Sequence, residues 1–393
     1  MERRVIIFGA GQIGRGFLGD IAHRSGFAVT FVDTAAALVD RLNAAHSYPL
    51  VVAGSRLHIR RIAPVRAVHA SDVAAIANEM ESAVCAFTAV GAGRILSLAP
   101  PLAAGLRRVL SRPGRCFNVL VCENLAHGAD ILAGRVCLEM AECATALRKR
   151  VGFVQTVVSR MVIAPAPAEI CGDPLAVLAE PYDRLPVAAE SFRGAVPDVR
   201  AFRPVESICP LEDLKLFLHN LPHAACAYLG FLRGHRLIRD ALADPDVRRV
   251  VAGVVREMTA VVSSRHSLSQ NAVRSYARSI LRRFSNPLMD DTIRRVARDP
   301  LRKLGPSERI SGAISAALSS GIQPASVCLV AAAALCYNDR DDPQASRLQE
   351  MIAADGVDAV LRTLCGIEDP GIRATIGLWH ERFTYEGRTA QGG

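Results

Sequence analysis

The chain has 393 residues, of which 50% are hydrophobic and 5% are aromatic. A chain of this length and composition can bury more than one core, which predicts a soluble protein of two domains. The net charge of +9 is spread along the chain, without a basic run interleaved with aromatic side chains. The positive excess therefore favours anionic small molecules over nucleic acid as ligands.

The sequence also argues against a membrane protein, an exported protein and a metal site. No stretch approaches the roughly 20 apolar residues of a membrane helix, so we expect no membrane partner. Met-Glu-Arg-Arg runs directly into the first predicted strand, which leaves no room for a signal peptide and favours the cytoplasm. The 11 cysteines form no Cys-x-x-Cys pair and no Cys/His cluster with zinc spacing, so we expect buried thiols and no metal.

A glycine-rich turn stands between the first predicted strand, residues 5–8, and an apolar helix. Gly9 permits a tight turn, Gly11 lets the backbone approach a pyrophosphate, and Gly14 lets the helix pack closely on the strand. A second strand, residues 27–32, ends at Asp33, about 20 residues after the turn, where a carboxylate binds the ribose hydroxyls of NAD and repels the phosphate of NADP. The predicted cofactor-binding residues are Gly9, Ala10, Gly11, Gln12, Ile13, Gly14, Asp33, Thr88 and Val90.

The first half of the chain continues as alternating strands and helices. Apolar runs at residues 83–90, 116–122 and 151–158 predict further buried strands of a doubly wound parallel sheet. The second of these runs ends at Glu123 and Asn124, and polar residues directly after parallel strands lie where such sheets bind ligands. Asn124 is equally compatible with a turn or a helix cap. The proline-rich segment 164–210 is interpreted as a connection.

From residue 211 onward the pattern is helical. Residues 246–263, 311–319 and 324–336 show helical spacing, small side chains and little β-branched alternation. We therefore predict an α/β fold with a Rossmann-type domain over residues 1–205, followed by an all-α domain over residues 206–385.

Lys215, Asn220 and His223 fall in one stretch of this second domain. At about 100° per residue, Asn220 lies roughly 140° and His223 roughly 80° around a helix from Lys215, so all three could address one pocket. A base, an amide and an imidazole could then surround one alcohol, although a solvated lysine and a structural histidine remain the alternative. Pro222 predicts a kink or a break in this helix.

Several motifs together resemble the polyol-specific long-chain dehydrogenases. They are Phe-Gly-Ala-Gly-x-Ile-Gly-Arg-Gly-Phe from residue 8, Leu-Asn-Ala-x-His-Ser-Tyr from residue 42, Cys-Glu-Asn from residue 122, Lys-x4-Asn-x2-His from residue 215, Pro-Leu-Arg-Lys-Leu from residue 300, and Asp-Asp-Pro-Gln-Ala from residue 341. The resemblance covers nearly the whole chain. It implies a zinc-independent interconversion of D-mannitol 1-phosphate and D-fructose 6-phosphate with NAD. The sequence leaves the oligomeric state open between a monomer and a small homo-oligomer.

The resemblance also implies roles for individual residues. Lys215 matches the general base, Asn220 and Asn124 match a pair of amides around the reacting oxygen, and His223 matches a substrate-binding histidine. Arg295 and Lys303 match residues that contact substrate hydroxyls or the phosphate end. Glu212, also assigned to the substrate site, matches a glutamate linked to proton passage. A lysine with its ordinary pKa of about 10.4 is a poor base at neutral pH, so the mechanism requires burial or nearby positive charge to lower that pKa.

The sequence departs from the family pattern at Ser159-Arg160, where relatives carry Asp-Arg, and at Leu221-Pro222, where relatives carry a small residue and glycine. Three alternatives therefore stay open. The chain could oxidise a free hexitol, reduce a hexuronate, or bind NAD as a regulator without turnover.

Overall fold

The computed structural model describes residues 3–391. The chain divides into two compact units between Leu211 and Glu212, slightly after the boundary at residue 205 that the sequence suggested. Each unit is described separately below.

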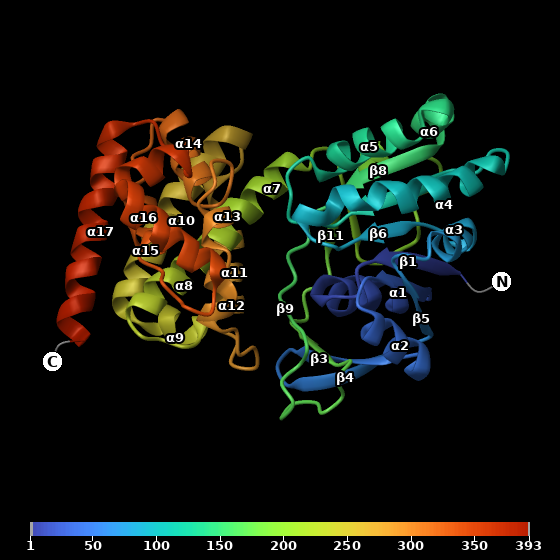
Figure 1. The fold of residues 1–393 in the computed structure, drawn as a ribbon, viewed down its shortest axis with the longest axis horizontal. Coiled ribbons are helices and arrows are strands. Elements are labelled where there is room, and N and C mark those ends of the chain that lie inside the picture. Colours follow the sequence, from blue (N-terminus) through green and yellow to red (C-terminus); the bar gives the residue numbers. More distant parts are fainter. Residues whose placement is uncertain (1–2, 392–393) are drawn as a thin grey trace. The chain divides into compact units, whose positions relative to one another are not determined.

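Unit 1 is built on a parallel six-stranded sheet with the order β5-β2-β1-β6-β7-β8 (Figure 1). Its strands are β1 (Arg4–Phe8), β2 (Ala28–Asp33), β5 (Val65–His69), β6 (Ala86–Thr88), β7 (Phe117–Val121) and β8 (Val151–Gln155). Counted within the sheet, this is the order 3-2-1-4-5-6 of a Rossmann fold. The prediction of a doubly wound parallel sheet is confirmed. Each predicted strand is present: β1 and β2 differ from the predicted limits by one residue at one or both ends, whereas β6, β7 and β8 are shorter than predicted.

Helices cover both faces of this sheet, so its strands are apolar on both sides. The helices of unit 1 are α1 (Gly19–Arg24), α2 (Ala36–Ala45), α3 (Val73–Ser82), α4 (Ala99–Ser111), α5 (Gly128–Glu139) and α6 (Ala144–Arg150). Along β1 the side chains alternate between two cores: Val5 and Ile7 enter the core that includes α1, whereas Ile6 and Phe8 enter the core under α3 and α4.

Two smaller sheets complete unit 1. One has the order β4-β3-β10-β9 and consists of β3 (Tyr48–Ala53), β4 (Leu57–Ile62), β9 (Val162–Ile163) and β10 (Val177–Ala179). The other pairs β11 (Leu185–Ala188) with β12 (Phe202–Val205). The interpretation of residues 164–210 as a mere connection is therefore wrong. These strands are too short to show a hydrophobic period. β10 pairs with the distant β3, and β11 pairs with β12 within the segment.

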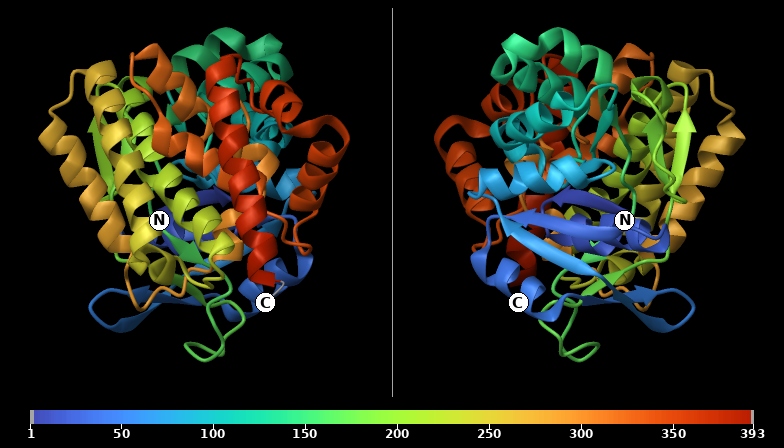
Figure 2. Two further views of the ribbon diagram at one scale, coloured as in Figure 1. Left: turned by 90° about the vertical axis from the view of Figure 1, so that its left-hand side faces the viewer. Right: turned by 90° about the vertical axis from the view of Figure 1, so that its right-hand side faces the viewer.

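Unit 2 is helical, as predicted, and α8 lies at its centre, packed against α9, α10, α12 and α15. Its helices are α7 (Cys209–Lys215), which crosses the division between the units, α8 (Leu221–Leu232), α9 (Ile238–Ala243), α10 (Pro245–His266), α11 (Gln270–Phe284), α12 (Ile293–Ala297), α13 (Pro300–Lys303), α14 (Ser311–Ser319), α15 (Ala325–Leu335), α16 (Pro343–Thr363) and α17 (Pro370–Gln391). The long α17, red in Figure 2, packs on α15 and α16. Within residues 3–391, no helix is both long and apolar enough to cross a membrane.

A buried carboxylate ties α1 of unit 1 to the β4 strand. Asp20 is fully buried and accepts hydrogen bonds from Arg60 at 2.5 Å and from Arg160 at 2.7 Å. Arg160 is itself buried and donates a second hydrogen bond to the carbonyl of Glu180 at 2.6 Å. Arg160, the second residue of the Ser159-Arg160 pair, is therefore a structural residue of unit 1.

This network generates a stability prediction. Asp20→Ala leaves the buried guanidinium of Arg160 without its carboxylate, so we expect the free energy of unfolding to fall by about 3–5 kcal/mol. Urea unfolding followed by circular dichroism measures this change. The matched control is Asp183→Ala, because Asp183 pairs with Arg24 at 2.8 Å on the exposed surface and should cost less than about 1 kcal/mol. Equal losses in the two variants would contradict the structural role of Asp20.

Candidate active site

The glycine turn at the end of β1 has a backbone that only glycine satisfies at two positions. Gly9 has φ of 100°, and a Cβ there would overlap the carbonyl of Ala89. A Cβ on Gly14 would overlap the carbonyl of Gly9, so the helix can pack this closely on the turn only without a side chain. A Cβ on Gly11 would meet nothing within 4 Å. The turn is therefore open at Gly11, the side where a pyrophosphate approaches a dinucleotide turn.

Asp33, at the end of β2, is held in place by the backbone around it. Its Oδ2 accepts a hydrogen bond from the Ala10 amide in the glycine turn at 2.7 Å, and its Oδ1 accepts one from the Ala35 amide at 2.9 Å. The carboxylate thereby joins the β1 turn to the β2 turn. Each oxygen retains a lone pair that a ribose hydroxyl can use.

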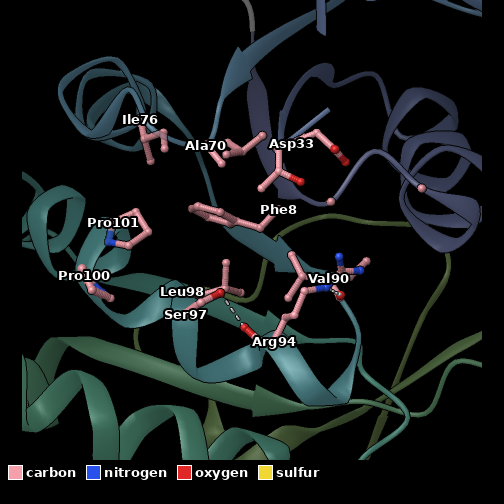
Figure 3. A pocket seen from close by; sticks show the side chains of 15 residues that line it. Phe8, Asp33, Ala70, Ile76, Val90, Arg94, Ser97, Leu98, Pro100 and Pro101 are labelled. Atoms are coloured by element: carbon pink, nitrogen blue, oxygen red, sulfur yellow. Dashed lines mark hydrogen bonds between the residues drawn. The ribbon is translucent and has the colours of Figure 1, made fainter. Parts of the chain in front are cut away.

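A pocket of about 240 Å³ opens beside Asp33 and the glycine turn (Figure 3). Figure 3 shows Phe8, Asp33 and Ile76 on one side of it, and Arg94 and Pro101 on the other. The pocket lies at the carboxyl ends of β1, β2 and β6, on both sides of the point where the strand order reverses. This is the crevice in which doubly wound sheets bind ligands.

Glu123 fixes the loop after β6 that forms one wall of this region. Its carboxylate accepts hydrogen bonds from the Thr88 hydroxyl at 2.5 Å and from the Val90 amide at 3.0 Å. Burial raises the pKa of Glu123, against the opposing effect of these hydrogen bonds. Thr88 and Val90 were predicted to bind the cofactor, whereas no role of its own was predicted for Glu123. Its signals in the sequence were its place directly after a predicted strand and within the Cys-Glu-Asn motif.

Asn124 lies in an exposed position between two anchored residues. On one side, Glu123 is bound to the β6 loop. On the other, the Gln155 side chain at the end of β8 donates to the carbonyl of Leu125 at 2.9 Å and accepts from the Ala129 amide at 2.8 Å. The loop that carries Asn124 is thus held at both ends at the carboxyl edge of the sheet.

In unit 2 the helix that carries Lys215 does not break at Pro222. It passes from α7 through a π-helical segment, Leu216–Asn220, into α8, and helical backbone angles continue through Asn220 and Leu221. The Leu221 amide donates to the carbonyl of Leu216, five residues back. The expected kink or break is therefore replaced by a widened turn, a feature found frequently at functional sites.

The widened turn changes which side chains share a face. An i→i+5 hydrogen-bond pattern brings residues five apart nearly above one another, so Asn220 lies closer to the face of Lys215 than a regular helix would place it. His223 follows Asn220 by three residues, one α-helical turn further. Glu212, half-buried, precedes Lys215 by three residues on α7. We therefore expect the predicted residues of this segment to lie on one side of the helix.

His223 contacts Asp291, a residue for which the sequence predicted no role. The His223 Nε2 lies 3.0 Å from Asp291 Oδ2, although the ring is not aligned for a straight hydrogen bond. Arg295 donates two hydrogen bonds of 2.7 Å to the same carboxylate, one to each oxygen. Burial raises the pKa of Asp291, but His223 and Arg295 outweigh it and hold that pKa below its usual range. The structure thus places Arg295 beside His223, with Asp291 between them.

The His223 ring also stacks on Phe284, with ring centroids 4.4 Å apart and planes inclined by 16°. Burial lowers the pKa of His223, ahead of the opposing effect of Asp291. The imidazole is therefore neutral near pH 7.

Lys303, the other cation assigned to the substrate, is only 4% exposed. Its ammonium group donates to the carbonyl of Arg298 at the turn between α12 and α13. Burial, followed by repulsion from Arg309 and Arg302, lowers the pKa of Lys303 well below its ordinary value. Lys303 therefore supports this turn rather than presenting a solvated charge. Among residues 3–391, no three His, Cys, Asp or Glu side chains gather as a metal site.

Comparison with known proteins places both units in one family. The model of the mannitol dehydrogenase Rossmann domain matches residues 3–200, and the model of the mannitol dehydrogenase C-terminal domain matches residues 207–373. The mannitol-1-phosphate 5-dehydrogenase of Bacillus licheniformis is 35% identical over 364 residues, which cover 92% of this chain and 95% of that protein.

Two solved structures share the fold. The mannitol 2-dehydrogenase of Pseudomonas fluorescens, in complex with NAD and D-mannitol, has a TM-score of 0.80 at 18% identity, covering 99% of this chain and 93% of its own. A D-sorbitol dehydrogenase has a TM-score of 0.79 at 16% identity, covering 98% and 94%. The family models match almost the full length, and the resemblance in the motifs is confirmed: this chain belongs to the mannitol dehydrogenase family of oxidoreductases.

Proposed function

We propose that this protein interconverts D-mannitol 1-phosphate and D-fructose 6-phosphate with NAD as the oxidant or NADH as the reductant. The observation that carries the proposal is the π-helical segment between Lys215 and Leu221, which supports placing Lys215, Asn220 and His223 on one side of the helix, in a chain that also has a dinucleotide turn. The named relative at 35% identity supports the choice of a phosphorylated substrate. The direct test follows NADH loss with fructose 6-phosphate, fructose and fructuronate, and we expect clear preference for the first.

The residues of unit 1 fit NAD. The open side of Gly11 leaves space for the pyrophosphate, and the amides at the start of the following helix can donate to it. Asp33 is fixed at the end of β2, where it can accept hydrogen bonds from the ribose hydroxyls. Thr88 and Val90 are held by Glu123 at the next strand end. When bound, NAD supplies the acceptor for the hydride.

In the oxidation direction, the unprotonated amine of Lys215 takes the proton of the substrate's C5 hydroxyl. Asn220 donates a hydrogen bond to the oxygen as negative charge develops there, which stabilises the transition state more than the ground state. Asn124 of unit 1 is the second amide in this proposal, on the strength of the family motif. His223 and Arg295 hold the hydroxyls of the bound substrate.

A free hexitol is the second candidate substrate. The two cationic side chains assigned to the substrate, Arg295 and Lys303, do not present an unpaired, solvated charge for a phosphate. Asp291 neutralises Arg295, and Lys303 is buried with a lowered pKa. Arg298 is exposed and lies 4.0 Å from Asp299, without a closer ion pair to any residue that the structure describes, so its guanidinium remains accessible to a phosphate. Similar kcat/KM values for fructose and fructose 6-phosphate would favour this second candidate.

The first kinetic prediction concerns the base. Lys215→Ala should lower kcat by about 10² to 10⁴, because it removes the group that accepts the proton. The Kd of NADH, measured by fluorescence titration, should change less than about twofold, and an added small amine should restore part of the rate. The matched control is Lys149→Ala, since Lys149 is an exposed lysine on α6 of unit 1. Near-normal turnover of Lys215→Ala would remove Lys215 from the mechanism.

A second prediction concerns cofactor choice. Asp33→Asn removes the negative charge but keeps an oxygen for one of the two backbone amides, so it is a milder change than Asp33→Ala. We expect the ratio of kcat/KM for NAD to that for NADP to fall by about tenfold or more, because repulsion of the extra phosphate is relieved. Asp72→Asn is the control, since Asp72 also accepts from a backbone amide but caps α3. A wild-type enzyme that prefers NADP would overturn the assignment.

The third prediction separates hydroxyl recognition from phosphate recognition. Because Asp291 balances its charge, Arg295→Ala should lower kcat/KM by roughly one to two decades for fructose 6-phosphate and fructose alike. Arg298→Ala should instead lower kcat/KM for fructose 6-phosphate more than for fructose. The four ratios come from initial rates of NADH oxidation. If Arg295→Ala affected the phosphorylated substrate alone, Arg295 would be a phosphate ligand and not a hydroxyl ligand.

A further inference from the structure

Asp291 lies at a junction of three helical elements of unit 2. Its side chain is 7% exposed and contacts His223 of α8 and Arg295 of α12. Its backbone carbonyl accepts a hydrogen bond from the Ile238 amide at the start of α9, at 2.9 Å. A buried carboxylate with so many fixed neighbours can hold other groups in one geometry. Its desolvation cost is offset by the charge-assisted hydrogen bonds from the arginine.

The contact with His223 determines which ring nitrogen carries the proton. A neutral imidazole has one N–H and one lone pair. The ring is not aligned for a straight hydrogen bond, but Nε2 and the carboxylate Oδ2 lie only 3.0 Å apart, and two acceptor atoms at that distance would repel each other if Nε2 carried no proton. The proton is therefore on Nε2, and Nδ1 is an acceptor. Stacking on Phe284 fixes the plane of the ring.

The contact with Asp291 occupies two of the nitrogen donors of Arg295. Nε and one terminal nitrogen, Nη2, bind the two oxygens of Asp291 in a fork. The other terminal nitrogen keeps its two N–H groups as donors. The Asp291 carboxylate thus leaves Nδ1 of His223 as an acceptor and one terminal nitrogen of Arg295 as a donor. A polyol hydroxyl is both donor and acceptor, so it can satisfy both.

We propose that Asp291 is a positioning residue of the active site, which fixes the Nε2–H tautomer of His223 and orients the guanidinium of Arg295 for the hydroxyls of a polyol substrate. Asp291 acts through these two side chains and does not itself contact substrate. The proposal rests on the proposed function for its substrate, but the tautomer and the orientation are properties of the free protein.

The first measurement is independent of turnover. Long-range ¹H–¹⁵N spectra of protein labelled at histidine nitrogen report the tautomer of each ring, and His223→Gln identifies the signal of His223. In wild type, we expect the Nε2–H form. In Asp291→Ala, where nothing disfavours a lone pair on Nε2, we expect a mixture of the two tautomers. An Nδ1–H form in wild type, or an unchanged Nε2–H form in the variant, would overturn the proposal.

The second measurement uses kinetics. Asp291→Asn should raise KM for fructose 6-phosphate and lower kcat/KM by on the order of 10- to 100-fold, because the two substrate-holding groups lose their geometry. The KM of NADH should stay unchanged, which a general loss of structure would not allow. Asp291→Glu, which keeps the charge, should recover part of the loss. A value of kcat/KM for Asp291→Asn within twofold of wild type would contradict the proposal.

Asp244→Asn is the matched control. Asp244 also lies between an arginine and a histidine, with Arg233 at 2.6 Å and His235 at 3.0 Å, and it caps α10. Its loss should lower stability and leave the kinetic constants unchanged. If wild type fails to use fructose 6-phosphate, the proposed function fails, whereas the histidine spectra still decide whether Asp291 sets the tautomer.

Discussion

The hydrogen bond from the Leu221 amide to the carbonyl of Leu216 sets the geometry of the candidate site in unit 2. Pro222 cannot donate a hydrogen bond, and its ring would clash with the carbonyl four residues earlier in a regular helix. The chain avoids this clash by widening one turn, so that the helix continues into the buried α8. As a result, a continuous helix carries Lys215 and Asn220, and its wider turn brings Asn220 toward the face of Lys215. Pro222 is therefore compatible with a continuous helix through the candidate site.

Carboxylates that accept hydrogen bonds from their surroundings organise the candidate site residues of each unit. In unit 1, Asp33 joins the first two strand ends and Glu123 joins the next two. In unit 2, Asp291 joins α8 to α12. Each is at least partly buried, and removing water from a charge is costly unless hydrogen bonds replace it. These carboxylates hold the loops and side chains in a fixed geometry before a ligand binds.

The sequence predicted what local patterns determine. Glycine is required at positions 9 and 14 by steric contacts within the turn itself, and β1, β2, β6, β7 and β8 lie in apolar runs long enough to recognise, whereas β5 was not predicted. In unit 2, the helical spacing predicted α10, α14 and α15. The contact between His223 and Asp291 could not be predicted, since it joins residues far apart in the chain. The widened turn at Pro222 was equally hidden, because a proline alone indicates a break and only packing of α8 on its neighbours decides for continuity.

The motifs that identify the family are largely structural supports. Asn43 exchanges two hydrogen bonds with the Ala67 backbone, which ties α2 to β5. Tyr48 donates to the carbonyl of Arg15 at 2.6 Å, behind the glycine turn. Asp342 accepts from the Asp299 amide and so holds the turn that precedes α13. These side chains make their hydrogen bonds within the chain itself, so their motifs report the fold. The substrate must be read from the side chains that these supports leave exposed to it.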